Sequence, residues 1–203
     1  MFTTPRLVAI ALCAALNFAI GIIVYLTKLP VFLDSVGTIL CALLIAPDRR
    51  AAIVCAFVAG LIGVVLSLPI NPFLPWFSLT VLAIALVSAL LTARATQTFR
   101  ARPPAVPAFA GWVVLCGVVT GVVAAIVSAP VVAYLFGGVT GSGSAFLVAF
   151  FLKTGEQLLN AAVLAGLTTE PIDKTLQVLV AALLYRATPR EFIATLRPAQ
   201  PAT

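Results

Sequence analysis

The 203-residue chain contains no histidine, and only 9% of its residues are charged. The lack of histidine removes the commonest metal ligand and the usual general base near neutral pH. In contrast, 63% of the residues are hydrophobic, and the mean hydropathy is +1.20. A soluble core of this size could not bury so much apolar surface. The composition predicts a protein embedded in a membrane, and it leaves no stretch for a soluble ATPase, kinase or DNA-binding domain.

Cysteine and charge are both too sparse and too scattered to build a metal site or a nucleic-acid surface. The four cysteines show no C-x-x-C spacing and lie inside apolar runs, where they resemble small buried hydrophobic residues: Cys13, Cys41, Cys55 and Cys116. The net charge is +6, but the basic residues occur singly or in pairs between apolar runs. This pattern is typical of membrane topology signals rather than of a basic nucleic-acid-binding face.

Apolar runs recur along the whole chain, and a helix needs about 20 such residues to cross the hydrocarbon core. We expect one all-α membrane domain over residues 1–203, a bundle of six transmembrane helices over approximately 7–27, 34–46, 51–68, 74–93, 109–135 and 172–186. A further apolar segment near 145–167 is predicted to be a re-entrant or surface helix on the outer side. Such a segment needs protein or water around its polar backbone, so it should border a cavity.

The distribution of lysine and arginine predicts that both termini lie in the cytoplasm. With the N-terminus inside, nine of the twelve basic residues fall on the cytoplasmic side: Arg6, Arg49, Arg50, Arg94, Arg100, Arg102, Arg186, Arg190 and Arg197. Lys28, Lys153 and Lys174 fall on the outer half. Because cytoplasmic loops retain positive charge, a seventh full crossing by 145–167 would reverse this bias at the C-terminal end.

The first predicted helix has two different faces. Ala11, Ala15 and Ala19 repeat every four residues and form a smooth strip that would let another helix approach closely. Asn17 lies about 200° from Ala15 around the helix, so we expect it to point into the bundle while the strip faces a neighbouring protein. The alternative is that the strip packs inside this chain.

Polar side chains on the predicted outer side are candidates for ligand contacts. Asp34 could cap the short second helix, contact a ligand, or do both. Lys153, Glu156, Gln157 and Asn160 have the spacing i, i+3, i+4 and i+7, which places them on one helical face. They could bind a ligand, or Lys153 and Glu156 could simply pair with each other.

The last predicted span begins with Pro171, Asp173 and Lys174, as expected for a helix start, although ligand contact at this level is also possible. The glycine-rich run 137–143 lacks the GK[ST] ending of a phosphate-binding loop, and we interpret it as a turn or a lid. No nucleophile with a base, and no matched pair of carboxylates, is evident. We therefore expect a protein that is not an enzyme.

These features together resemble the substrate-binding S component of an energy-coupling factor (ECF) transporter. The resemblance covers nearly the whole chain and is carried by the alanine strip and the paired short helices around Pro47. It is also carried by three segments: KLPVFLDSVGTI at 28–39, FGGVTGSG at 136–143, and PIDK at 171–174 before a last apolar helix and Pro189.

The resemblance implies a six-helix binding subunit of an ABC-type importer in the bacterial cytoplasmic (inner) membrane. Such a subunit takes up a vitamin or vitamin precursor and works with a transmembrane coupling protein and two cytoplasmic ATPases. ATP is used by those partners, so this chain would bind no cofactor, metal or nucleic acid. The implied docking surface is the alanine strip, and the implied pocket residues are Asp34, Trp76, Tyr134, Lys153, Glu156, Gln157 and Asn160. The residue patterns above add Asn17, Asp173 and Lys174 to the expected substrate-binding set. No signature identifies the vitamin, and a ligand-binding membrane sensor with a signalling partner is the alternative.

Overall fold

The computed structural model describes residues 2–27, 31–46, 48–101, 106–140 and 143–196, with side chains omitted over 93–101. The described part is helical, without strands. Its elements are α1 (Thr4–Thr27), α2 (Val36–Ile45), α3 (Arg49–Ser67), the 3₁₀ helix η1 (Leu74–Phe77), α4 (Ser78–Ala101), α5 (Val106–Pro130), the π-helix η2 (Val131–Leu135), α6 (Ser144–Lys153), α7 (Leu158–Ala187) and α8 (Arg190–Thr195). Several positions named above lie outside the described residues: 28–30, Pro47, Arg102, 141–142 and Arg197. The side chains of Arg94 and Arg100 also lie outside them.

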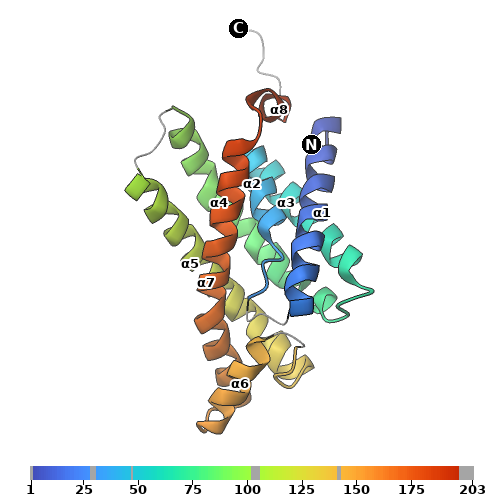
Figure 1. The fold of residues 1–203 in the computed structure, drawn as a ribbon, viewed down its shortest axis with the longest axis vertical. Helices are drawn as coiled ribbons and strands as arrows, with labels where there is room; N and C mark the ends of the chain where they lie inside the picture. The colour runs from blue at the N-terminus through green and yellow to red at the C-terminus, as the bar shows by residue number, and fades with distance from the viewer. Residues whose placement is uncertain (1, 28–30, 47, 102–105, 141–142, 197–203) are drawn as a thin grey trace.

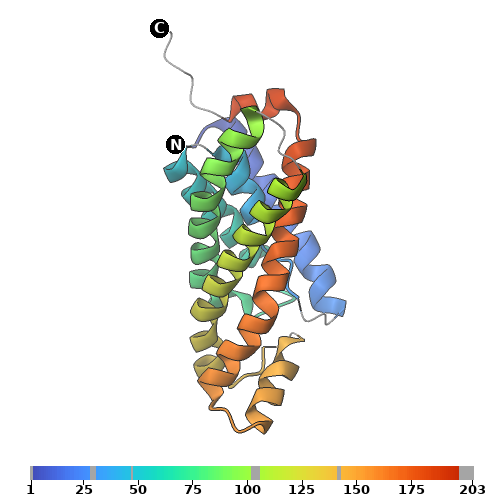
Figure 2. The same ribbon diagram turned by 90° about the vertical axis from the view of Figure 1, so that its left-hand side faces the viewer.

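The helices form an elongated bundle in which α5 and α7 lie side by side and reach beyond the others (Figures 1 and 2). α6 packs against α7 at this extended end. α1, α2, α3 and α4 form the rest of the bundle, and α2 contacts α1, α3, α4 and α7. The start of α1 and the short helix α8 lie together at the opposite end (Figure 1).

Four segments are long and apolar enough to cross a membrane: Thr4–Thr27, Arg49–Ser67, Leu74–Thr92 and Val106–Leu135. Large apolar side chains such as Leu12, Ile23 and Leu79 remain exposed on these helices, as expected for surfaces that contact lipid. The protein is therefore a helical membrane protein by the length and composition of its helices. α2 has only 10 residues. α7 has 30 residues, a length of about 45 Å at 1.5 Å per residue, but it carries charged residues in its middle.

A buried arginine joins three parts of the chain at the end where α8 lies. Arg6 on α1 donates to the carbonyl of Leu196 at 2.9 Å and pairs with Asp48 at 3.3 Å. Asp48 also caps α3, because its Oδ1 accepts from the backbone N–H of Ala51 at 3.1 Å. Arg6 therefore holds the start of α1, the start of α3 and the end of α8 together.

Glycine explains how α5 and α7 approach so closely. A Cβ atom at Gly117 would overlap Thr175, and one at Gly121 would overlap the backbone of Pro171. In a membrane, where lipid competes with apolar packing, small residues of this kind allow helix backbones to make direct contact.

The structure corrects the prediction for the last third of the chain. The apolar segment 145–167 is not a separate re-entrant helix followed by a span over 172–186, because α6 ends at Lys153 and α7 runs unbroken from Leu158 through Pro171 to Ala187. Proline lacks an N–H and therefore removes one helical hydrogen bond, but membrane helices tolerate such a loss where neighbouring helices pack closely. Here Gly121 on α5 lies directly against the backbone of Pro171.

Candidate functional site

A cavity lies between α1, α3, α4 and α7 and is bordered by the loop over residues 31–35 and by α6. Its volume is about 120 Å³, many times the roughly 10–15 Å³ that holds a single water molecule on the same measure. Polar and charged residues line much of it: Asn17, Asp34, Ser35, Thr38, Ser67, Asn71, Thr80, Ser128, Thr140, Ser144, Thr169, Glu170 and Lys174. Aromatic residues add Tyr25, Phe32, Phe73 and Phe77. Apolar walls with a few converging polar groups are typical of small-molecule sites.

Asn17 fixes the contact of α1 with the start of α2. Its Oδ1 accepts from the backbone N–H groups of Gly37 at 2.6 Å and Thr38 at 3.3 Å, and its Nδ2 donates to Thr38 Oγ1 at 3.0 Å. Gly37 is necessary because a Cβ atom there would overlap the carbonyl oxygen of Cys13 on α1. Asn17 therefore satisfies two of the N–H groups that a helix start leaves free.

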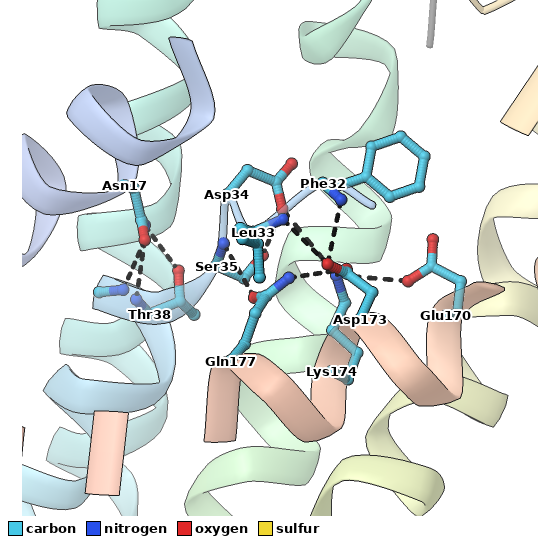
Figure 3. A network of polar contacts seen from close by, with 11 residues as sticks. Asn17, Phe32, Leu33, Asp34, Ser35, Thr38, Glu170, Asp173, Lys174 and Gln177 are labelled. Atoms are coloured by element: carbon cyan, nitrogen blue, oxygen red, sulfur yellow. Dashed lines mark hydrogen bonds and ion pairs between the residues drawn. The ribbon is translucent and has the colours of Figure 1, made fainter. Parts of the chain in front are cut away.

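Asp173 and Gln177 on α7 hold the loop that borders the cavity (Figure 3). Asp173 Oδ1 accepts from the backbone N–H groups of Phe32 and Leu33, each at 3.0 Å. Gln177 Oε1 accepts from the N–H of Ser35 at 3.0 Å. Leu33 has a φ of +48°, a left-handed conformation that is costly for a leucine. The side chains of α7 thus determine the path of the loop.

Lys174 is surrounded by three carboxyl groups. Its Nζ is 2.7 Å from Asp173 Oδ2, 3.3 Å from Glu170 Oε2 and 3.9 Å from Asp34 Oδ1. Gln177 Nε2 donates to the same Asp173 oxygen at 2.7 Å. The lysine side chain is only 2% exposed, so it could not remain charged without these partners.

Two buried polar atoms at the cavity have no hydrogen-bond partner in the described structure: Thr80 Oγ1 and Glu170 Oε2. The Glu170 oxygen lies within ion-pair distance of Lys174 but without the geometry of a hydrogen bond. Thr80 is 7% exposed, and the Glu170 side chain is 9% exposed. Buried polar groups are usually satisfied, so the Thr80 hydroxyl is available to a ligand or to water. The Glu170 oxygen can accept a hydrogen bond in addition to its ion pair with Lys174.

Aromatic rings cover another part of the cavity. Phe73 and Phe77 line it and are held in place by Phe136, whose ring centroid is 4.9 Å from that of Phe73 and 6.0 Å from that of Phe77. Phe32 lies on the loop, with Lys174 Nζ 5.9 Å from its ring centroid. The cavity therefore offers flat apolar surfaces beside carboxyl groups.

The structure places the predicted substrate-binding residues in two groups. Asn17, Asp34 and Lys174 line the cavity, and Asp173 is buried directly behind it. The others are exposed and do not line it: Trp76, Tyr134, Lys153, Glu156, Gln157 and Asn160. The predicted common helical face for the last four is wrong, because the chain leaves the helical conformation between α6 and α7.

The two faces of α1 separate as the helical spacing predicts. Ala11, Ala15 and Ala19 are exposed, whereas Asn17 is buried against α2. The alternative in which the strip packs within this chain does not hold for the described residues. The strip is therefore free to contact lipid or another protein.

Glu170 and Gln177 were missed by the sequence analysis, although a signal was present. Glu170, Asp173, Lys174 and Gln177 also have the spacing i, i+3, i+4 and i+7, and here one continuous helix does bring them together. The prediction that a helix begins at Pro171 separated Glu170 from the other three residues, so the pattern was not recognised.

Among the described residues, no group of three or more cysteine, aspartate or glutamate side chains is arranged to hold a metal ion. The chain was also compared with known proteins. No model of a protein family, no curated protein and no solved structure matches it.

Proposed function

We propose that this chain is the small-molecule-binding subunit of an ECF-type importer and that the cavity holds the transported substrate. The observation that carries the proposal is a cavity inside a helical membrane bundle. Its walls include a buried hydroxyl without a hydrogen-bond partner among the described residues, Thr80 Oγ1, and the carboxyl group of Glu170, which is ion-paired with Lys174 at 3.3 Å. Orphaned polar groups in a cavity are costly unless something binds them. A vitamin or vitamin precursor has the mixture of polar and flat apolar surface that such a cavity accepts.

The proposed topology has six crossings of the bacterial cytoplasmic membrane, with both termini in the cytoplasm. Four of these crossings are the long apolar segments, the fifth is α7, and the sixth is the short α2 together with the loop that precedes it. α7 can cross despite its charges because Asp173, Lys174 and Gln177 are buried in protein and bonded to one another. The positive-inside rule supports this orientation, since Arg49 and Arg186 belong to the end of the bundle where α8 lies.

The proposed partners are a transmembrane coupling protein and two cytoplasmic ATPases, which would supply energy by hydrolysing ATP. The exposed strip of Ala11, Ala15 and Ala19 is the proposed docking surface for the coupling protein. Small side chains allow close helix contact in a membrane, and one large side chain would separate the two backbones.

The first experiment purifies the chain in mild detergent from cells that express the whole importer. We expect mass spectrometry to identify a retained small molecule and the coupling protein with both ATPases in the same fraction. Absence of both the molecule and the ATPases would reject the proposal. Copurification with a histidine kinase instead would favour a sensor.

The second experiment tests the docking surface with Ala15→Leu. We expect substrate uptake into cells to fall at least tenfold while the affinity of the purified chain for its retained molecule changes less than twofold. Ala110→Leu is the matched control, because it places the same side chain on an exposed position of α5. Equal loss of uptake and affinity in Ala15→Leu would show that the strip has a structural role within this chain.

A further inference from the structure

The distribution of charge around the cavity indicates which class of ligand it accepts. We infer that the cavity selects a ligand carrying a positively charged group, which lies between the carboxyl groups of Asp34 and Glu170, together with an aromatic or other flat apolar part. This inference rests on the proposed function, in that it takes the cavity to be the ligand site.

Carboxyl groups outnumber basic groups at the cavity. Asp34, Glu170 and Asp173 surround Lys174, which is the only basic residue among the described residues that line the cavity. Three carboxylates and one ammonium give a formal charge of −2. The chain as a whole has a net charge of +6 and only six acidic residues, so half of its acids gather at this point.

Lys174 does not neutralise all three acids equally. Its shortest contact is with Asp173, at 2.7 Å, and Asp173 also receives two loop N–H groups and Gln177. Asp173 is thus fully satisfied within the protein. Glu170 and Asp34 lie farther from the ammonium, at 3.3 Å and 3.9 Å, and both line the cavity. These two carboxyl groups remain for a ligand.

Two further observations at the same cavity point to a ligand. Thr80 Oγ1 is buried, lines the cavity and has no hydrogen-bond partner in the described structure. The rings of Phe73 and Phe77 form an apolar wall, and aromatic faces attract cations as well as flat rings. In Figure 3, Phe32 lies on the same loop as Asp34, so a third aromatic ring lies near the carboxyl groups. A cation with an attached ring would use all three features.

The experiment uses three small probes that each carry one benzene ring and differ in charge: benzylammonium, benzyl alcohol and benzoate. The full chain is purified in detergent without partners, dialysed extensively, and unfolded thermally at increasing probe concentrations. A ligand that binds only the native state raises Tm, so the concentration dependence gives an apparent dissociation constant. We expect benzylammonium to bind at least tenfold more tightly than benzyl alcohol and benzoate not to bind.

Charge-removing variants link this preference to the cavity. Glu170→Gln should weaken benzylammonium at least tenfold and change benzyl alcohol less than threefold. Asp34→Asn is the second variant, because Asp34 is partly exposed on a loop and its substitution disturbs less packing. Glu191→Gln removes the same charge from an exposed position on α8 and should behave like the unaltered chain. Any effect of a probe on the detergent micelle changes Tm equally in all variants, so it cancels when the variants are compared at the same probe concentration.

Three results would overturn the inference: equal or tighter binding of benzyl alcohol or benzoate, no stabilisation by any of the three probes, or a cation preference that both Glu170→Gln and Asp34→Asn retain. Failure of the importer proposal is measured separately, by the absence of both a retained molecule and the ATPases when the chain is purified from cells that express the whole importer. Either proposal can therefore fail while the other holds.

Discussion

The contact between α7 and the loop at the cavity makes Asp173→Asn a severe change despite its small size. The carboxylate of Asp173 accepts four hydrogen bonds, from the N–H groups of Phe32 and Leu33 on one oxygen and from Lys174 and Gln177 on the other. Asparagine replaces one of these oxygens by an NH₂ group, which cannot accept. Either orientation of the amide therefore leaves two buried donors facing another donor.

The expected loss of stability follows from this count. A buried hydrogen bond to a charged group contributes about 1.5–3 kcal/mol, so two such losses amount to about 3–6 kcal/mol. Lys174 keeps Glu170 and Asp34 as partners, which favours the lower end, about 3 kcal/mol. The free energy of unfolding can be measured by titration with sodium dodecyl sulfate in mixed micelles. Hydrogen exchange should show faster exchange at the amides of Phe32 and Leu33.

The control for Asp173→Asn is Glu191→Gln, which makes the same chemical change on the exposed surface of α8. We expect it to alter the unfolding free energy by no more than about 0.5 kcal/mol. A loss below about 1 kcal/mol for Asp173→Asn, with unchanged exchange at the loop amides, would refute the assignment of Asp173 as the residue that holds the loop.

Two other substitutions test the packing and the cavity. Gly37→Ala should destabilise the chain by about 1–3 kcal/mol in thermal unfolding, because its methyl group would overlap the carbonyl of Cys13. The control is Gly111→Ala on α5, where open space surrounds the added methyl group; it should be neutral or stabilising by up to about 1 kcal/mol. Equal changes in stability for the two substitutions would contradict the close contact at Gly37. Thr80→Val should leave stability unchanged within about 0.5 kcal/mol, because the hydroxyl has no partner, while mass spectrometry should detect less retained small molecule. Loss of stability without loss of the retained molecule would mean that the hydroxyl serves the fold.

The general architecture was predictable because hydrophobicity and helical spacing report on each segment alone. Of the six spans predicted from apolar runs, four coincide with helices long and apolar enough to cross a membrane. The angle between Ala15 and Asn17 separated the exposed face of α1 from its buried face. The continuity of α7 through Pro171 was not predictable from the same rules. Proline commonly begins a helix in water, but in this bundle α7 continues through Pro171, where Gly121 on α5 leaves space for it.

The site was only partly predictable because it depends on which helix remains continuous. The same polar spacing occurs twice, once from Lys153 to Asn160 and once from Glu170 to Gln177. The first is interrupted between α6 and α7 and its side chains are exposed, whereas the second lies within α7. Cavity residues on other elements, such as Thr80 on α4 and Phe73 just before η1, have no local pattern and become recognisable only when the helices are brought together.

The arrangement of Asp173 and Asp34 links the position of the loop to the charge of the cavity. The backbone of the loop is bonded to Asp173, while the side chain of Asp34 on the same loop lines the cavity beside Lys174. A cation bound between Asp34 and Glu170 would repel the Lys174 ammonium, which would then be held by Asp173 alone. The cavity and the loop that borders it are therefore connected through one carboxylate, because Asp173 contacts Lys174 with one oxygen and the loop N–H groups with the other.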